Sequence, residues 1–429
     1  MSPSPLREAL LVTDRVFVRP YDGSAATYAA WLLALKRLGY AVTVVSFNQA
    51  RLRWTEADLA RLADQASRVL ILDAHPSLAA AALSKVESVA WRALAGRRYP
   101  PRLVGRRHVA ENAARLARFV GAHRFDVVAV HKVSSVRLLG GVLDALAAHK
   151  VIDMHDNAPR RARLFRSAAL RLLPTYPLVS RLLRVEEVGD VLCWASEARM
   201  MREEAGQVRG FDAVLFPAEE EARAFAAAGI GPATVRALPV PGPVDLTPTA
   251  GRTGEFHLGF VGADDLFNFE AVAFLIRQVL PRLRRAHPGL RVLIAGGTAR
   301  SAARPLRDDG VTFVPWIERI GNFYRQVQVV AVPLLSGTGA SVKTIEAAAY
   351  ASAIVATAVG VRGLSLQHGQ DVLVADTGES FAAAVSSLLG DPSLRARLGA
   401  GAAARVAARH SLDAFVGEIG ALLPVNAAP

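Results

Sequence analysis

Short apolar runs alternate with helical patterns along nearly the whole chain of 429 residues. In the first half, the apolar runs have the length and composition of buried strands. These predicted strands are Ala9–Asp14, Tyr40–Phe47, Arg68–Ala74, Asp126–His131, Val151–Asp156 and Ala213–Ala218. Strands that alternate with helices in this way are typical of a parallel sheet covered by its own crossover helices.

A stretch rich in proline and glycine, residues 237–254, predicts an interdomain linker. After it, the strand–helix alternation begins again and continues until the terminal helices predicted at 392–423. The predicted strands of this second series are His257–Gly262, Arg291–Gly297, Val311–Trp316, Val329–Leu335, Ala353–Thr357 and Asp371–Asp376. Two such series predict an α/β protein with two Rossmann-like domains facing across a cleft.

The predicted domain boundaries follow the linker. Residues 1–245 would form the first domain, residues 246–412 the second, and residues 413–429 a terminal helix and tail. Hydrophobic residues make up 52% of the chain, which is enough for two sizeable cores.

Amino-acid composition and net charge limit the cellular compartments and the kinds of partner that fit this protein. The single cysteine, Cys193, excludes an internal disulfide and fits a reducing compartment. There is no charged leader followed by an apolar run and no apolar run of about 18 residues, so we predict a cytoplasmic protein without a spanning helix. The net charge of +13 favours acidic partners, namely nucleic acid, anionic lipid or phosphorylated substrates. No basic run with interleaved aromatic residues supports nucleic acid.

Residues 158–185 combine many arginines with Leu, Phe and Tyr. This pattern fits a segment lying on an anionic membrane surface, which would place the protein peripherally at the inner face of the plasma membrane. It fits equally an ordinary pair of amphipathic helices with a solvated basic face.

The strongest candidate for chemistry is the stretch from Ser336 to Glu346, which lies between a predicted buried strand and an Ala-rich helix. Such a loop lies at the carboxyl edge of a parallel sheet, where ligands bind. Gly337 and Gly339 allow close approach to the backbone, and the helix start offers N–H groups to an anion. Lys343 and Glu346 share one helix face, so they could hold a phosphate and the vicinal hydroxyls of a ribose. An ordinary solvated ion pair is the alternative.

Two features of the first half are weaker candidates. His155 and Asp156 end a predicted strand, where a histidine can contact a phosphate or sugar hydroxyl or move a proton. The alternative is a histidine satisfied by local backbone, and His131 has the same kind of position. Gly23, in the loop after the first strand, could line a nucleotide site or serve only as a turn residue.

The second half resembles the donor-binding half of family 4 glycosyltransferases of the GT-B fold. The resemblance covers roughly residues 255–412 and rests on Gly259–Gly262, Asn268–Val272, Leu293–Gly297 and the stretch ending at Glu346. It implies a retaining, metal-independent enzyme without a cofactor. That enzyme would move a sugar from a nucleoside-diphosphate sugar to a hydroxyl of a saccharide or lipid-linked acceptor, as in bacterial surface polysaccharide or glycolipid synthesis.

The resemblance also implies roles for individual residues. Glu346 would hold the ribose, Lys343 and the amides near Gly339 the pyrophosphate, and His155 or Asp156 would approach the donor sugar as catalytic residues. The donor-binding residues would be Glu346, Lys343, Gly339, Ala340, Thr338, Gly262, Asn268 and Gly23, and no metal ligand is expected.

The sequence departs from the family pattern at four places. Thr338 stands where the family often has a glutamate, Arg362 stands where another glutamate is common, and Ala351 to Ala353 replace a Gly-x-Pro turn. Asp264 and Asp265 stand where a basic pair is often seen, and would repel a diphosphate unless they point away. These departures support the alternative of a catalytically degenerate GT-B-fold binding or scaffold protein.

Overall fold

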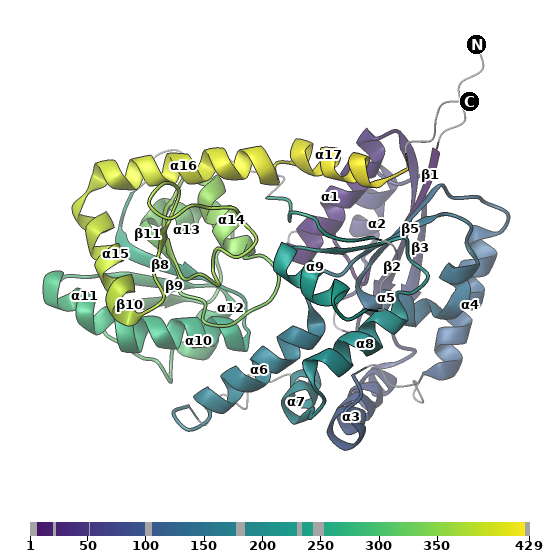
Figure 1. Ribbon diagram of the computed structural model, residues 1–429, viewed down its shortest axis with the longest axis horizontal. Coiled ribbons are helices and arrows are strands. Elements are labelled where there is room, and N and C mark those ends of the chain that lie inside the picture. Colours follow the sequence, from purple (N-terminus) through teal and green to yellow (C-terminus); the bar gives the residue numbers. More distant parts are fainter. Residues whose placement is uncertain are drawn as a thin grey trace, which may run out of the picture. The chain divides into compact units, whose positions relative to one another are not determined.

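The computed structural model describes residues 7–19, 23–50, 52–98, 105–176, 185–229, 234–242 and 253–424. The chain forms two compact units (Figure 1). Unit 1 comprises Met1–Pro159, Leu192–Pro241 and Leu412–Pro429, and unit 2 comprises Arg160–Val191 and Gly242–Ser411. The grouping of 160–191 with unit 2, and of the C-terminal segment with unit 1, differs from the contiguous domains predicted from the sequence.

Unit 1 is built on a seven-stranded parallel sheet with the order β3-β2-β1-β4-β5-β6-β7. Its strands are Arg7–Val12 (β1), Tyr40–Asn48 (β2), Arg68–Asp73 (β3), Val127–His131 (β4), His149–Asp153 (β5), Ala213–Phe216 (β6) and Thr234–Ala237 (β7). Its helices are Gly23–Arg37 (α1), Glu56–Ala63 (α2), Leu78–Ala95 (α3), Arg106–Val120 (α4), Lys132–Leu139 (α5), the 3-10 turn Gly140–Ala145, Glu197–Gln207 (α8), Glu219–Ala226 (α9) and Leu412–Leu422 (α17).

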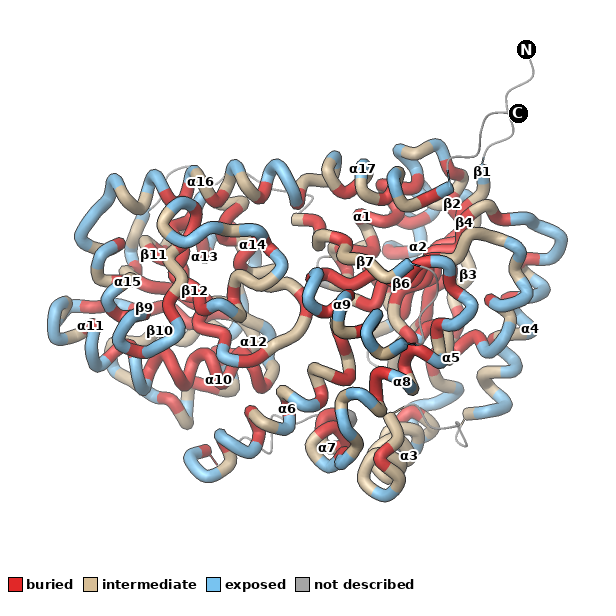
Figure 2. Tube along the Cα trace, in the orientation of Figure 1, coloured by how far each residue is buried: buried red, intermediate tan, exposed pale blue. Residues whose placement is uncertain are grey.

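Both faces of this sheet are covered, because successive side chains of a strand point to opposite faces. In β1, Ala9 and Leu11 belong to the core cluster beneath α1 and α17, whereas Leu10 and Val12 belong to the cluster beneath α4, α5, α8 and α9. Burial on both faces explains why the strands are continuously apolar. β1, β2, β4 and β6 are accordingly mostly red in Figure 2, whereas β3, at one edge of the sheet, is mostly of intermediate burial.

Unit 2 contains a six-stranded parallel sheet with the order β10-β9-β8-β11-β12-β13. Its strands are Phe256–Val261 (β8), Val292–Ala295 (β9), Val311–Val314 (β10), Val327–Val332 (β11), Ala353–Ala356 (β12) and Leu373–Val374 (β13). Its helices are Ala158–Leu172 (α6), Val185–Leu192 (α7), Leu266–Phe274 (α10), the π-helical turn Leu275–Val279, Leu280–Ala286 (α11), Gly297–Ala302 (α12), Ile320–Gln326 (α13), Val342–Ala349 (α14), Gly378–Gly390 (α15) and Pro392–His410 (α16).

Specific contacts explain the two segments that leave their expected domains. In α6, Phe165 packs edge-on against Phe267 with ring centroids 5.4 Å apart, so the helix is attached to α10 of unit 2. In α17, Phe415 packs against Trp31 of α1 at 6.0 Å. The predicted terminal helices at 392–423 are thus α16 and α17, which belong to different units.

The prediction of two Rossmann-like domains is confirmed, since each unit is a parallel sheet with helices connecting its strands. Most of the predicted linker, and the second part of the segment 158–185, lie outside the described residues. Within the described part of the chain, no helix is both long and apolar enough to cross a bilayer.

Candidate functional site

The stretch from Ser336 to Glu346 connects β11 to α14, as the sequence predicts. Gly339 has a φ of 70°, a left-handed conformation that favours glycine. Ser341 precedes the helix, but its side chain makes no capping bond to the backbone of α14. The first turn of α14 therefore keeps the N–H groups and partial positive charge that attract anions.

Lys343 lies in this first turn, half-buried, and its Nζ donates to Oδ1 of Asn268 at 2.7 Å. Burial lowers the pKa of Lys343, while Asp265 and Glu346 act in the opposite direction. The described residues offer no carboxylate in ion-pair contact with Lys343. The ammonium is therefore held by a neutral amide and is not neutralised.

Glu346 lies one turn further along α14, and its Oε2 accepts a hydrogen bond from the hydroxyl of Tyr324 at 3.2 Å. Burial raises the pKa of this carboxyl group. Tyr324 is itself stacked on Tyr350, with ring centroids 4.9 Å apart. Lys343 and Glu346 thus contact different partners, which does not match the alternative of a simple solvated ion pair.

Two glycine turns, after β8 and β9, pack closely against each other, and the first also packs against Asn268. A β-carbon on Gly262 would lie 2.8 Å from Cγ of Asn268, and one on Gly296 would lie 2.5 Å from the carbonyl oxygen of Gly262. Only glycine fits at such distances, so Gly262 allows Asn268 to reach Lys343. The structure therefore brings three predicted donor-binding residues together.

Asp264 and Asp265, the acidic pair that follows Gly262, both accept hydrogen bonds from other groups of the protein. Asp265 caps α10 by accepting from the backbone N–H of Asn268 at 2.9 Å, and it also accepts from the Asn268 side chain at 2.7 Å. Asp264 accepts a hydrogen bond from the hydroxyl of Ser301. These contacts hold both carboxylates in structural roles and orient Asn268 toward Lys343.

Two arginines brace the loop before α14. Nη2 of Arg362 donates to the carbonyls of Gly337 and Gly339 at 2.8 and 3.2 Å. Nη2 of Arg171, from α6, donates to the hydroxyl of Ser336 at 3.0 Å. Thr338 and Ala340 are half-buried in the same loop. Arg362 thus adds positive charge where the family pattern often has a glutamate.

Unit 1 carries a second polar cluster at the carboxyl ends of β4 and β5. Nδ1 of His131 and Nε2 of His155 are 2.8 Å apart, so one ring nitrogen donates to the other. His155 has a φ of 62°, and its backbone N–H donates to Oδ1 of Asp153 at 3.2 Å. Asp156 is half-exposed, and its backbone N–H donates to the carbonyl of Met154. The cluster thus unites His155 with His131 and Asp153.

Burial shifts the pKa values of the titratable side chains in this cluster. It lowers the pKa of His131 to about 3 and the pKa of His155 well below its ordinary value, and it raises the pKa of Asp153 to about 6. Both histidines are therefore neutral at pH 7. The 3.8 Å separation of His131 from Asp153 is accordingly not an ion pair, although the two groups are close.

Several residues of this cluster were not predicted. Asp14, at the end of β1, accepts from the hydroxyl of Tyr28 at 2.6 Å and lies 3.4 Å from Nζ of Lys132. Trp31 donates from Nε1 to Oδ2 of Asp153 at 3.0 Å. The signal in the sequence was the position of Asp14 and Lys132 at strand ends, whereas Tyr28 and Trp31 are indistinguishable there from core residues of α1. Gly23 is the first residue of α1.

The described residues contain one group that could hold a metal ion, formed by His131, Asp153 and His155, whose ligand atoms lie within 4.8 Å of one another. A metal there would replace the hydrogen bond between the two histidines. It would also meet the positive charge of Lys132, which lowers the pKa of both imidazoles. The residues present fit a hydrogen-bonded cluster better than a metal centre.

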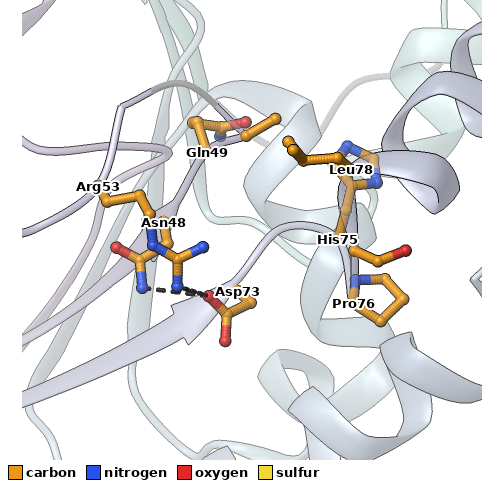
Figure 3. A pocket seen from close by; sticks show the side chains of 9 residues that line it. Asn48, Gln49, Arg53, Asp73, His75, Pro76 and Leu78 are labelled. Carbon is orange, nitrogen blue, oxygen red and sulfur yellow. Dashed lines mark hydrogen bonds and ion pairs between the residues drawn. The ribbon is translucent and has the colours of Figure 1, made fainter.

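A polar pocket lies at the carboxyl ends of β2 and β3, beside the start of α3 (Figure 3). Oδ1 of Asp73 accepts from Arg53 at 3.2 Å and from Asn48 at 3.1 Å. Its lining residues are Asn48, Gln49, Ala50, Arg53, Asp73, His75, Pro76, Ser77 and Leu78. A carboxylate, a guanidinium and two amides around one hollow are suited to a ligand rich in hydroxyl groups.

A family model shows to which class of proteins most of the second unit is similar. Residues 255–391 match the family model for glycosyl transferases group 1. No curated protein matches the chain by sequence. The resemblance to family 4-like glycosyltransferases is therefore confirmed for the region that contains Asn268, Lys343 and Glu346.

Solved structures extend the similarity of fold to the whole chain. Sucrose-phosphate synthase from Thermosynechococcus elongatus has a TM-score of 0.65 at 14% identity, over 97% of this chain and 98% of that one. Anabaena HepE, in complex with UDP and glucose, has a TM-score of 0.62 at 14% identity over 97% and 98% of the two chains. A mutant of S. aureus TarM, with UDP and saccharides, has a TM-score of 0.63 at 7% identity over 98% and 100%. The fold is that of the GT-B glycosyltransferases.

Proposed function

We propose that this protein is a retaining, metal-independent glycosyltransferase that moves a sugar from a nucleoside-diphosphate sugar to a hydroxyl of a saccharide or lipid-linked acceptor. The observation that carries the proposal is the half-buried Lys343, which contacts Asn268 and no described carboxylate at the start of α14. A half-buried cation that no described carboxylate contacts, in the first turn of a helix, is a place for an anionic group. HepE and TarM are both seen in complex with UDP, so UDP is the first nucleotide to test.

The donor site would act on the leaving group. A departing diphosphate gains negative charge, and fixed N–H groups at the start of α14 together with Lys343 would stabilise that charge without a metal. Glu346 would accept hydrogen bonds from the ribose hydroxyls, in place of or beside its bond from Tyr324. Gly262 and Gly339 would let the diphosphate approach the backbone, and Ala340 and Thr338 would line the same loop.

The cluster of unit 1 would act on the donor sugar. A neutral His155 can accept or donate a hydrogen bond to a sugar hydroxyl but carries no charge of its own at pH 7. His131 would fix the orientation and tautomer of His155 through their 2.8 Å hydrogen bond. We propose His155 and Asp156 as the residues that approach the donor, and Gly23 as a residue lining this part of the site.

The proposal also includes the cellular compartment, the type of biosynthesis and the acceptor. We place the protein in the cytoplasm, in the synthesis of a bacterial surface polysaccharide or glycolipid, with a saccharide or lipid-linked acceptor. The TarM mutant is seen in complex with alpha-GlcNAc-glycerol and Fondaparinux, which supports an acceptor of this class.

Thermal unfolding with UDP, GDP, TDP and ADP tests the donor site. A nucleotide at about 100 times its dissociation constant should stabilise the protein by roughly 2.7 kcal/mol and raise its melting temperature. The shift should disappear in Lys343→Ala and weaken in Glu346→Gln. Lys36→Ala, at an exposed position of α1, is the matched control and should keep the wild-type shift.

The outcomes separate the candidate functions. No shift with any of the four nucleotides would refute the proposed donor site. A shift without transfer or hydrolysis of the corresponding nucleotide sugar would instead support a catalytically degenerate binding protein, to which the change at Thr338 would then be relevant.

A further inference from the structure

Helix α3 carries its apolar side chains on the outside. All eighteen of its residues are described, and Ala81 is the only buried one. Its exposed residues are all apolar, and its polar residues are all half-buried. The exposed residues are Leu78, Ala79, Ala82, Leu83, Val86 and Leu94. A surface helix of a globular protein normally has the opposite arrangement.

The exposed side chains form one stripe. Leu83, Val86 and Leu94 are 57%, 60% and 82% exposed, and with Ala79 and Ala90 they recur at spacings of three and four residues. Such spacing places them on a single helix face. In Figure 2, α3 is correspondingly mostly tan and pale blue. We name this stripe the α3 face.

The apolar surface continues past the C-terminal end of α3. The ring of Trp194 lies against Gly96, because a β-carbon on Gly96 would be 2.9 Å from it, and Trp194 is 56% exposed. Arg199 lies over the same ring at 5.4 Å and donates to the carbonyl of Ala95. A half-exposed tryptophan beside an arginine is typical of the boundary between lipid headgroups and acyl chains.

The charge around the α3 face favours one kind of partner. Arg97 and Arg98 directly follow the C-terminal end of α3, and Arg199 donates to the carbonyl of Ala95 at that end. Glu203 pairs with Arg97 there. The α3 face itself consists only of Ala, Leu and Val, without the aromatic and hydrogen-bonding side chains that enrich protein interfaces. Apolar side chains beside such arginines match an anionic lipid surface.

We propose that unit 1 docks on an anionic membrane surface through the α3 face and Trp194. This assigns membrane contact to α3 and not to the segment 158–185. The polar pocket with Asp73 and Arg53 begins where α3 begins, and Leu78 lines it (Figure 3). If the proposed transferase function holds, the pocket would receive the polar part of an acceptor that is embedded in the same membrane. The docking itself does not depend on that function.

Co-sedimentation with lipid vesicles tests the proposal. Wild type should bind vesicles of phosphatidylcholine containing phosphatidylglycerol and bind pure phosphatidylcholine much less. The triple variant Leu83→Gln, Val86→Gln and Leu94→Gln should lose at least about tenfold in vesicle affinity, because three apolar side chains no longer enter the bilayer. Glutamine is a good helix former, so α3 should remain folded, as circular dichroism would verify.

A matched control addresses the other candidate segment. Leu170 lies on α6 and is 55% exposed, so Leu170→Gln removes an equally exposed leucine from 158–185. This variant should bind vesicles as wild type does. Binding lost in Leu170→Gln and kept in the triple variant would overturn the assignment to α3.

Two further results would overturn the proposal outright. One is a wild type that binds neither kind of vesicle. The other is a wild type that self-associates, by light scattering, through a contact abolished in the triple variant, since the α3 face would then join two copies. The UDP-induced thermal shift, measured on the same proteins, reports separately on the proposed function and should be equal in wild type and the triple variant.

Discussion

At the scale of single residues, the buried pair of His131 and His155 makes stability depend on pH. The pKa of His131 falls from 6.5 to about 3 because burial disfavours the imidazolium, and the pKa of His155 is lowered for the same reason. Unfolding restores the ordinary values, so below pH 6.5 the unfolded chain binds more protons. The stabilisation contributed by the neutral imidazoles is complete above pH 6.5 and is lost as the pH falls.

Asp153 acts in the opposite sense. Its pKa is raised from 3.8 to about 6, so the folded state binds this proton first as the pH falls from about 6 to 3.8. In that window Asp153 offsets the contribution of one histidine. The cluster as a whole therefore loses stability with about the pH dependence of one histidine, and not of two, between about pH 6 and pH 4.

We expect His131→Gln to reduce the acid sensitivity of the protein. Below pH 6.5, wild type should lose stability relative to the variant by up to about 1.4 kcal/mol per pH unit, the contribution of one titrating histidine. Urea unfolding at several pH values between 5 and 8 measures this difference. The expected magnitude assumes that each site binds about one proton. Parallel curves for the two proteins would show that His131 is not held neutral by burial.

Only part of the arrangement of the candidate site residues could be predicted from the sequence. Lys343 and Glu346 lie within one helical turn, so their common face follows from helix geometry alone. Asn268, which holds Lys343, comes from another helix 75 residues earlier. Sequence spacing carries no information on such a contact, and the family pattern indicated Asn268 only as a donor-binding residue. The contact between His131 and His155 became visible only in the structure, where β4 pairs with β5.

At the scale of elements, α14 ends in a Schellman motif. The N–H of Ser352 donates to the carbonyl of Ala347 at 2.9 Å, and the N–H of Ala351 donates to the carbonyl of Ala348 at 2.8 Å. The helix end is thus well defined, although the sequence lacks the Gly-x-Pro turn. The motif places Ala351 at a φ of 50°, where glycine is usual.

Ala351→Gly should therefore stabilise unit 2 by about 0.5 to 1 kcal/mol, because it removes the strain of a β-carbon in the left-handed region. Urea unfolding measures this gain. Ala383→Gly, at an exposed position inside α15, should instead destabilise by up to about 1 kcal/mol. Equal losses in both variants would contradict the strain at Ala351.

Helix α6 is fastened to unit 2 by one ion pair with a buried partner. Nε and Nη2 of Arg171 both donate to Oε1 of Glu270, at 3.1 and 2.6 Å, and Glu270 is only 3% exposed. Removing one partner leaves a buried charge without compensation. This contact is one reason why α6 leaves the N-terminal part of the chain to pack on α10.

Arg171→Met should destabilise unit 2 by about 3 kcal/mol, and the double variant with Glu270→Met should recover most of that loss. Arg223→Met, which removes an exposed pair with Glu219 on α9, should cost less than about 0.5 kcal/mol. Urea unfolding of the four proteins measures the difference. A double variant no more stable than Arg171→Met would show that the arginine acts through packing and not through charge.

At the scale of the whole molecule, the alternation of apolar runs was sufficient to predict two Rossmann-like domains. It was not sufficient to assign α6 and α17, because an amphipathic helix specifies that one face is buried but not against which sheet. Phe165 and Phe415 have the same apolar pattern as any core residue of a helix, and only the structure identifies Phe267 and Trp31 as their partners.

The return of α17 to unit 1 has a consequence for biosynthesis. On the ribosome, α1 is made before every strand of unit 2, whereas α17, the helix that covers it, is made after all of them. Arg37 and Asp413, which form an ion pair between α1 and α17, are 376 residues apart. Throughout translation, Trp31 and the apolar face of α1 lack the cover that Phe415 and Ile419 provide in the finished protein. Unit 1 therefore cannot complete this core cluster until α17 has been synthesised.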